Sequence, residues 1–196
     1  SAMADGALAI VHGTTVATNA ALEGKGAHTV FVTNAGIEDM LRIGRQNRAE
    51  LYNLTPAPAN PTLTQLPCEG VQCRLDSEGN IIQTLSDTAL EDLIARIQAR
   101  QPESVAVCLL FAYLNGQQEQ RIADALQQSG LTVSTSHRII PTRGEYERGM
   151  ATWLNAWLSP KVAAYLQRLE NATTPAPLAI MQSNGGTIAA NQAREL

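Results

Sequence analysis

The sequence has little charge, few aromatic side chains and only three cysteines. Charged residues make up 16% and aromatic residues 4%, and 14 Lys and Arg against 18 Asp and Glu leave a net charge of −4. Nucleic-acid binding depends on an excess of Lys and Arg on one face, so this balance argues against a nucleic-acid partner. Intrinsic disorder needs low hydrophobicity with high net charge, and an apolar fraction of 44% argues against it.

Long apolar runs and a secretory leader are absent as well. No run approaches the roughly 20 residues that cross a membrane. The first residues, Ser1-Ala2-Met3-Ala4, have no basic stretch followed by an apolar one. We therefore expect no membrane partner and a cytoplasmic location.

The three cysteines, Cys68, Cys73 and Cys108, form neither a disulfide nor a zinc pattern. An odd number argues against a disulfide framework. No second pair of Cys or His residues lies near Cys68 and Cys73 to complete a zinc site, so no metal site is predicted. Cys108 lies in the apolar run 105–111 and is expected to be a small core residue.

Short apolar runs alternate along the chain with segments of helical periodicity. Strands are expected at 7–11, 28–33, 71–75, 81–85, 104–111, 131–136 and 178–182, and helices at 16–24, 36–43, from 86, at 117–129, at 145–169 and from 187. The repeated strand–helix–strand order predicts an α/β protein with a mainly parallel sheet and an inserted hairpin.

Three of the expected helices carry specific signals. Ser86 is a candidate N-cap for the helix that follows it. The predicted inward faces are Leu90, Leu93, Ile94 and Ile97 in that helix, and Ile122, Ala125 and Leu126 in helix 117–129. Pro160 interrupts the long apolar pattern 145–169, which predicts a kink there or two helices that meet.

Four polar turns follow strands or open helices, at the places where ligands bind in parallel α/β sheets. These turns are His12-Gly13-Thr14-Thr15 with Asn19 after it, Gly44–Arg48, Arg143–Arg148 and Ser183–Gly186. The hydroxyls of the first turn suit an anion or a carbonyl, although Thr14 or Thr15 would also serve as an ordinary helix cap. The guanidinium groups of the second turn, Gly44–Arg48, suit a carboxylate or phosphate, although a solvated loop has the same composition.

The remaining two turns also have ordinary structural interpretations. Acids in the first turn of the helix at 145 are ordinary partners of the helix dipole. The glycine-rich turn at 183–186 lacks the Gly-Lys-Ser/Thr of a phosphate loop. From composition and spacing alone, the chain is an α/β domain with a polar edge.

Several blocks in order resemble the hydantoinase/oxoprolinase family, in particular the N-terminal region of its hydantoinase A-type subunit. They are His12–Ala20, Gly24–Ala27, Ile43–Arg48 with Leu51-Tyr52, Ser104–Leu110, Glu145–Arg148, Leu154–Ala156 and Met181–Gly186. The His-Gly-Thr-Thr and Gly-Arg-Gln-Asn-Arg blocks are the most specific of them.

This resemblance implies an actin-like ATPase (ribonuclease H-like) fold and an ATP-dependent enzyme that opens a cyclic amide such as a hydantoin or 5-oxoproline. It implies ATP and Mg²⁺ as cofactors of the intact enzyme, with none expected in this chain alone, which is expected to be inactive. Implied partners are a hydantoinase B-type subunit or domain and a small cyclic-amide substrate, and a homo-oligomer is possible.

By the same resemblance, three groups of residues are candidates for a substrate or phosphate cleft. The groups are His12, Gly13, Thr14, Thr15 and Asn19; Arg45, Asn47 and Arg48; and Asn184, Gly185 and Gly186. Glu147 and Arg148 are further candidates that either reach the site or form an ion pair that positions the helix.

Departures from the family pattern predict an incomplete domain. A Gly-Gly-Thr-Phe-Thr-Asp phosphate loop and a later Gly-Gly-Thr-Ser block are missing, and Gly149 and Met150 replace usual hydroxyl residues. We expect residues 1–6 to be a tag remnant or linker and 7–172 a first α/β domain without its N-terminal hairpin. That domain would contain a proline-rich loop and hairpin at 53–85, and 173–196 would begin a second domain.

Two other functions remain open at this point. One is a subunit of an ATP-dependent ketone carboxylase of the acetone or acetophenone type, which shares the fold. The other is a non-enzymatic assembly module that docks a partner through the helix of Trp153 and Trp157. Plain core packing is the favoured interpretation of the two tryptophans.

Overall fold

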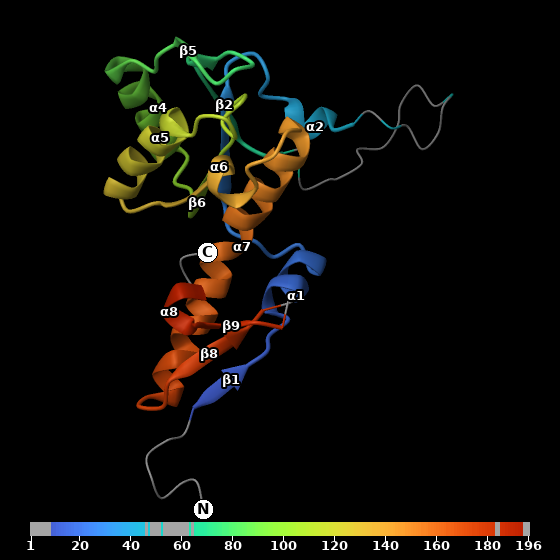
Figure 1. The fold of residues 1–196 in the computed structure, drawn as a ribbon, viewed down its shortest axis with the longest axis vertical. Coiled ribbons are helices and arrows are strands. Elements are labelled where there is room, and N and C mark those ends of the chain that lie inside the picture. Colours follow the sequence, from blue (N-terminus) through green and yellow to red (C-terminus); the bar gives the residue numbers. More distant parts are fainter. Residues whose placement is uncertain are drawn as a thin grey trace, which may run out of the picture. The chain divides into compact units, whose positions relative to one another are not determined.

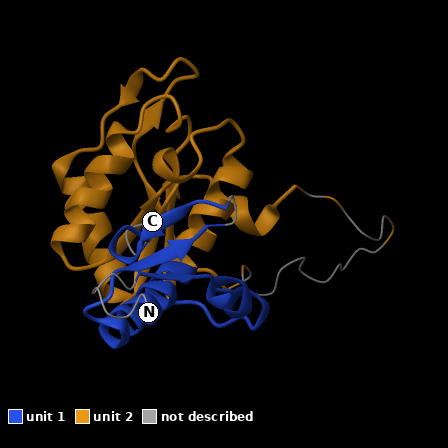
Figure 2. Cartoon of the chain, turned by 60° about the horizontal axis from the view of Figure 1, so that its bottom comes forward, with its two compact units in different colours: residues 1–27, 158–196 blue, residues 28–157 orange. Residues whose placement is uncertain are grey.

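A computed structural model describes residues 9–45, 47, 52, 63, 65–182 and 185–193. The chain forms two compact units (Figure 2). Unit 1 contains residues 1–27 and 158–196, and unit 2 contains residues 28–157. Each unit has its own sheet, which confirms the predicted α/β fold with mainly parallel pairing.

The sheet of unit 2 is fully parallel, in the order β3-β2-β6-β7. Its strands are β3 (Cys68–Val71), β2 (Thr29–Asn34), β6 (Ser104–Val107) and β7 (Thr132–Thr135). Every residue of β2 and β6 is buried. Continuous apolar strands of this kind are expected where helices cover both faces of a parallel sheet.

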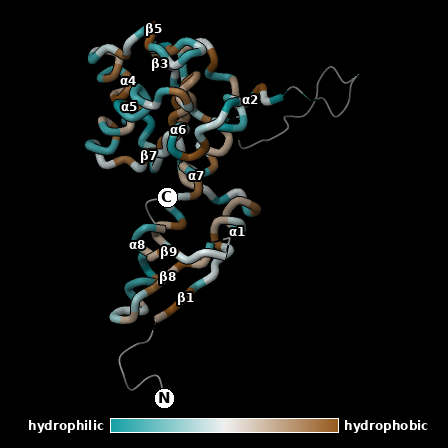
Figure 3. The backbone as a smooth tube through the Cα atoms, in the orientation of Figure 1, coloured by the Kyte–Doolittle hydropathy of each residue, from teal (hydrophilic) through white to brown (hydrophobic). Residues whose placement is uncertain are grey.

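Helices α4 (Asp87–Ala99) and α5 (Gln117–Gln128) lie together over one face of this sheet (Figure 1). Their inward residues pack with valines of β2 and β6 in one apolar core. The Ser86 hydroxyl accepts a hydrogen bond from the Ala89 N–H at 3.1 Å, which confirms the predicted N-cap. Along both helices, polar and apolar residues alternate in Figure 3, as amphipathic helices require.

The inward face of α5 differs in part from the prediction. Ile122 and Leu126 are buried as expected, but Ala123 rather than Ala125 is the fully buried alanine. Gln118 and Glu119 are buried as well, because each accepts backbone hydrogen bonds from outside the helix, at Leu85 and Leu109 respectively.

Helix α2 (Met40–Ile43) and the start of α7 (Glu145–Thr173) pack beside the same sheet. Gly149 of α7 approaches so closely that a Cβ atom there would lie 2.8 Å from Met40 Cε and 3.3 Å from Phe31 Cζ. The glycine that replaces a usual hydroxyl residue is therefore a packing residue. The short helix α6 (Ser136–Ile139) follows β7 directly.

The predicted hairpin is present as β4 (Arg74–Leu75) and β5 (Ile81–Gln83), which pair antiparallel. The Asp76 carboxylate accepts hydrogen bonds from the Glu78 and Asn80 N–H groups, both at 2.9 Å. Together with the Asn80 side chain, these bonds lower the pKa of Asp76. The turn is therefore ordered by its own side chains.

The sheet of unit 1 has the order β1-β8-β9. Strand β1 (Ile10–His12) runs parallel to β8 (Leu178–Met181), with Ile10 opposite Leu178 and His12 opposite Ile180. Strand β9 (Thr187–Ala189) returns antiparallel to β8. Apolar residues of α7 and α8 (Ala190–Ala193) pack on this sheet, while α1 (Val16–Leu22) follows β1.

One local prediction in unit 1 was wrong, and one of two alternatives at Pro160 is excluded. Residues 187–189 form a strand before the helix, because Gly185, at φ +84°, lets the chain reverse into a hairpin with β8. One continuous helix passes through Pro160, where two helices were an alternative. The predicted boundary between a first domain, 7–172, and a second domain that begins at 173 stays a prediction. The expectation that residues 1–6 are a tag remnant or linker stays a prediction too.

The proline-rich loop lies almost entirely outside the described residues. Within the described ranges, no helix is long and apolar enough to cross a membrane. Among the same residues, no group of three or more His, Cys, Asp or Glu side chains is arranged to hold a metal ion. All three cysteines are free, and burial raises the pKa of Cys108 to about 12, so its thiol stays protonated.

Replacing Leu93, which is fully buried in the core of unit 2, tests the packing of α4. Leu93→Ala removes three carbon atoms from a closed core and is expected to lower the free energy of unfolding by about 2–5 kcal/mol. Ile82→Ala is the control, since Ile82 is 67% exposed and its truncation leaves no cavity. Urea denaturation measures the free energy of unfolding of both variants. Equal losses would contradict the assignment of Leu93 to the core.

Candidate functional site

Two of the predicted site segments meet at one edge of the unit 1 sheet. Because β1 and β8 are parallel and His12 lies opposite Ile180, the segments that follow them leave the sheet at the same edge. Residues 13–15 follow β1, and Gly185 and Gly186 belong to the turn after β8. The carboxyl edge of a parallel pair is where α/β sheets bind ligands.

His12 is the half-buried anchor of this edge. Its Nε2 lies 2.8 Å from the Tyr165 hydroxyl of α7, and the two rings lie 5.9 Å apart between centroids. The hydroxyl fixes the orientation of the imidazole, since a ring nitrogen that is hydrogen-bonded has a defined partner. Nδ1 is the ring nitrogen that this bond leaves for another contact.

Thr14, Thr15 and Asn19 are exposed at the start of α1. Thr14 Oγ1 accepts a hydrogen bond from the Val16 N–H at 3.2 Å. Thr15 occupies the N-cap position without making a side-chain cap, and its hydroxyl receives only a 3.4 Å contact from the Asn19 amide. Thr14 therefore lies one residue before the N-cap and bonds only the first N–H of the helix, while Thr15 makes no side-chain cap and its hydroxyl can donate outward.

The two glycines of the edge leave open space. A Cβ atom added at Gly13 or Gly185 would meet no atom within 4 Å among the described residues. A ligand could thus approach the backbone closely at both positions. The edge offers hydroxyl, amide, imidazole and backbone groups, and its charge is neutral apart from any proton on His12.

Arg45 and Asn47 lie in unit 2 and are exposed. Arg45 forms an ion pair with Glu147 at 2.5 Å, and its Nε donates to the same oxygen at 2.6 Å. A hydrogen bond from the backbone N–H of Glu147 and the contact with Arg45 lower the pKa of Glu147. The arginine fork therefore already holds a carboxylate of its own chain.

Arg148 is a buried structural residue. It has no exposed surface, and its guanidinium donates to Ser136 Oγ at 3.0 Å, Thr142 O at 3.1 Å and Leu109 O at 2.6 Å. Glu145, at 3.7 Å, is its ion-pair partner. The alternative that Glu147 and Arg148 pair with each other was wrong, because Arg45 takes the Glu147 carboxylate.

A second buried group next to Arg148 was missed by sequence reasoning. Glu119 is fully buried and accepts hydrogen bonds from Ser136 Oγ at 2.6 Å, His137 Nδ1 at 2.7 Å and the Leu109 N–H at 2.8 Å. His137 is therefore part of a network with Glu119. A polar residue on the inward stripe of α5 was the one signal that could have revealed it.

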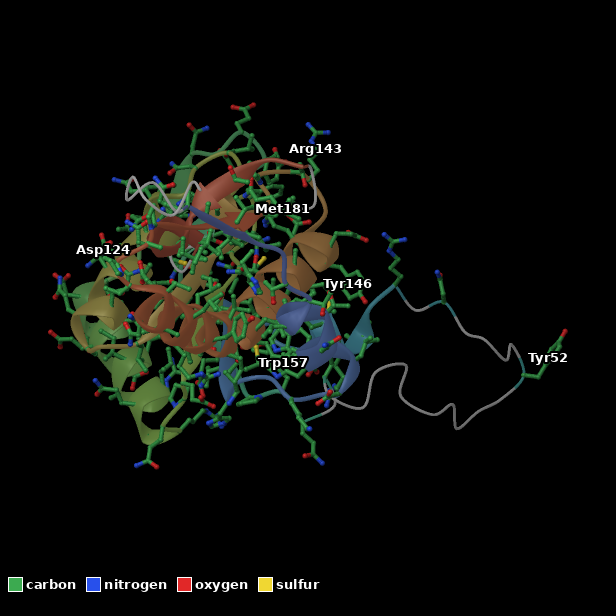
Figure 4. All side chains as sticks on the ribbon, turned by 90° about the horizontal axis from the view of Figure 1, so that it is seen from below. Tyr52, Asp124, Arg143, Tyr146, Trp157 and Met181 are labelled. Carbon is green, nitrogen blue, oxygen red and sulfur yellow. The ribbon has the colours of Figure 1, made fainter. Side chains whose placement is uncertain are left out.

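The remaining predicted residues add little to the description of the candidate site. Arg48 and Asn184 lie outside the described residues. Trp153 and Trp157 are 4% and 8% exposed and stack with ring centroids 5.3 Å apart (Trp157 is labelled in Figure 4), which confirms core packing. The predicted docking surface on that helix thus has no exposed indole.

Comparison with known proteins identifies the family. Residues 3–130 match the hydantoinase/oxoprolinase N-terminal region, and residues 148–196 match hydantoinase/oxoprolinase. The chain belongs to the hydantoinase/oxoprolinase family. The resemblance inferred from the His-Gly-Thr-Thr and Gly-Arg-Gln-Asn-Arg blocks is therefore confirmed.

Curated relatives are much longer than this chain. Caprolactamase subunit alpha of Pseudomonas jessenii is 30% identical over 90% of the chain, which spans 26% of that protein. 5-Oxoprolinase 1 of Arabidopsis thaliana is 29% identical over 89% of the chain and 16% of its own length. The acetophenone carboxylase gamma subunit of Aromatoleum aromaticum is 29% identical over 76% of the chain and 22% of its own length.

Two solved structures share the fold. The ATP-dependent caprolactamase from Pseudomonas jessenii superposes with a TM-score of 0.79 and 27% identity over 93% of this chain and 28% of its own. Nucleotide-free acetone carboxylase superposes with a TM-score of 0.73 and 26% identity over 95% of this chain and 29% of its own. The fold described above is thus part of larger enzymes.

The burial of Arg148 predicts a large loss of stability on its replacement. Arg148→Met leaves Leu109 O and Ser136 without their donor and is expected to lower the free energy of unfolding by about 3–5 kcal/mol. The matched control Arg45→Met breaks an exposed pair and should cost under about 1 kcal/mol. Chemical denaturation of both variants measures the difference, and a mild effect of Arg148→Met would refute the structural role.

The Arg45–Glu147 pair predicts a change in carboxylate titration. Because Arg45 is the second cause of the lowered pKa, after the residue's own backbone N–H, Arg45→Gln should raise the pKa of Glu147 part of the way to its ordinary value. NMR titration of the side-chain carboxyl follows this directly. Arg42→Gln, whose ion pair is with Asp39, is the control and should leave Glu147 unchanged.

Proposed function

We propose that this chain is part of an ATP-dependent hydrolase that opens a cyclic amide of the hydantoin, lactam or 5-oxoproline type. The observation that carries the proposal is the shared edge of β1 and β8, where the family's His-Gly-Thr-Thr block and its glycine turn lie together. The caprolactamase and 5-oxoprolinase relatives, which cover about nine-tenths of the chain, support this substrate class.

An unstrained amide resists attack by water, so ring opening needs an activated carbonyl carbon. ATP, when bound, would supply a phosphoryl group to the amide oxygen, which makes that carbon more open to attack by water, so that the ring C–N bond can break with the ring nitrogen as the leaving group. Hydrogen-bond donors around the phosphoryl oxygens lower the barrier of this kind of transfer. The edge of unit 1 provides donors of this kind from Thr14, Thr15 and Asn19.

The residues of the edge fit a phosphate group but do not complete its site. Open space at Gly13 and Gly185 suits close approach of phosphate oxygens to the backbone, and the Thr15 hydroxyl is free to donate. The described residues 12–19 and 185–186 include no carboxylate to hold Mg²⁺ and no Lys or Arg. The rest of the enzyme would supply these charges, in keeping with an actin-like ATPase fold.

His12 would orient the substrate or a phosphate oxygen. Its Nε2 is held by Tyr165, so Nδ1 is fixed in direction as well. Arg45, Asn47 and Arg48 would bind a carboxylate or phosphate group, and Asn184 would act with Gly185 and Gly186. The fork of Arg45 would have to leave Glu147 in order to bind a substrate carboxylate.

A ketone carboxylase subunit is the second candidate. It is favoured by the likeness to acetone carboxylase over 95% of the chain and to the acetophenone carboxylase gamma subunit. Relatives that are named as subunits support a partner protein, for which we propose a hydantoinase B-type subunit or domain.

The test is catalysis by the full-length protein with its partner subunit. Phosphate release from ATP is measured with 5-oxoproline, caprolactam or hydantoin, and separately with acetone or acetophenone plus bicarbonate. The hydrolase proposal predicts ATP cleavage coupled to ring opening in the first series. Turnover confined to the second series would establish the carboxylase function in its place.

Thr15→Val tests the edge within that enzyme. Loss of one hydroxyl donor from a phosphoryl site should lower kcat/KM at least about tenfold without a change in melting temperature. Thr18→Val, an exposed threonine of α1 outside the proposed donor set, is the matched control and should stay within about twofold. Equal activity of both variants would contradict a role for Thr15.

A further inference from the structure

Unit 2 contains a cavity that the proposed function does not use, and its lining includes the first residues of the predicted turn Arg143–Arg148. Its volume is about 310 Å³, at the lower end of the range for small-molecule sites. The lining residues are Ser77, Phe111, Tyr113, Arg143, Gly144 and Glu145. They come from the β4–β5 turn, the segment after β6 and the start of α7, at the carboxyl side of the parallel sheet.

The walls of the cavity are held rigidly. Phe111 has a φ of +58°, which is strained for a bulky side chain and needs support from its surroundings. The Tyr113 ring lies 5.3 Å from the guanidinium carbon of buried Arg148, and the Asn115 amide donates to Gly79 O at 3.1 Å. The hairpin turn and the segment after β6 are thus fastened together, and the cavity is preformed.

Two opposite charges face this cavity from positions close in sequence. Arg143 is exposed and has no hydrogen-bond or ion-pair partner among the described residues (labelled in Figure 4). Glu145 is partly exposed, and its only ion pair among those residues is the long one with Arg148, at 3.7 Å. A guanidinium without a partner suits a carboxylate, and a carboxylate with spare acceptor sites suits an ammonium group.

We propose that this cavity binds a small amino carboxylate, with Arg143 holding the carboxylate and Glu145 the ammonium group. The rings of Phe111 and Tyr113 face the carbon chain between the two charges. The Ser77 hydroxyl, from the hairpin turn, provides a further hydrogen bond. This site shares no residue with the edge of unit 1 that the proposed function uses.

The binding site and the proposed function can fail independently. Hydrolysis of a lactam leaves one carboxylate and one amine on the same molecule, so the ligand class is also that of the product of the proposed reaction. That connection rests on the proposed function, whereas binding of an amino carboxylate by this cavity does not.

Isothermal titration calorimetry of the 196-residue chain tests the site, with glycine, 4-aminobutanoate and 6-aminohexanoate as probes of increasing charge separation. Hexanoate and hexylamine are the matched controls, each lacking one charged group. At least one amino carboxylate should bind at least about tenfold more tightly than either control. Absence of binding by all three, or hexanoate binding as tightly, would overturn the proposal.

Two variants test which charged group of the ligand Arg143 and Glu145 each bind. Arg143→Gln should weaken both the best amino carboxylate and hexanoate about tenfold, whereas Glu145→Gln should weaken only the amino carboxylate. Arg138→Gln removes an exposed guanidinium of α6 outside the cavity lining and should change neither affinity. Unchanged affinity in Arg143→Gln would overturn the assignment.

A steric variant provides a test that does not depend on charge. Ser77→Trp places a large side chain in the cavity from an exposed turn, so the fold should tolerate it while binding is lost. Thermal melting followed by circular dichroism checks the fold of every variant. Retained binding by a folded Ser77→Trp chain would show that the ligand lies elsewhere and would overturn the proposal.

Discussion

The structure of unit 2 depends on one fully buried charge, the Arg148 guanidinium. The Arg148 guanidinium connects the segment after β6, through Leu109 O, with helix α6, through Ser136, and with the approach to α7, through Thr142 O. Glu119 completes the arrangement from α5 through the same serine. Buried charges are tolerated only when every group around them is satisfied. The positions of Arg143, Glu145 and Glu147 around the start of α7 follow from this one anchor.

Much of unit 2 could be predicted from the sequence because its signals are local. The apolar run at 28–33 correctly indicated a strand, and Ser86 correctly indicated a helix start. The run at 104–111 indicated a strand correctly only in its first half, because β6 ends at Val107. Arg148 could not be predicted in the same way. In sequence it is one more charge in a first helical turn, and only the fold brings Ser136 and Leu109 to it.

Unit 1 was harder to predict because its sheet is assembled from distant segments. The run before His12 was recognised as a strand, but nothing local assigns it to β8 rather than to β2. Thr187 and Ile188 follow a glycine turn and are good strand formers, so a hairpin signal was present beside the expected helix. The pairing of β1 with β8 is also what brings the His-Gly-Thr-Thr block and the glycine turn to one edge. Their meeting therefore depends on topology, whereas each block alone is visible in the sequence.

The pairing of β1 with β8 has a consequence for the order of folding. The first strand of the described chain must wait for one of the last, since all of unit 2 lies between Ile10 and Leu178. During synthesis, unit 2 is complete while β8 has yet to leave the ribosome, and domains fold as units as they emerge. Contacts between such distant residues form slowly because a long loop must close first. The edge of unit 1 that we propose as a ligand site is therefore expected to be among the last parts of this chain to acquire its structure.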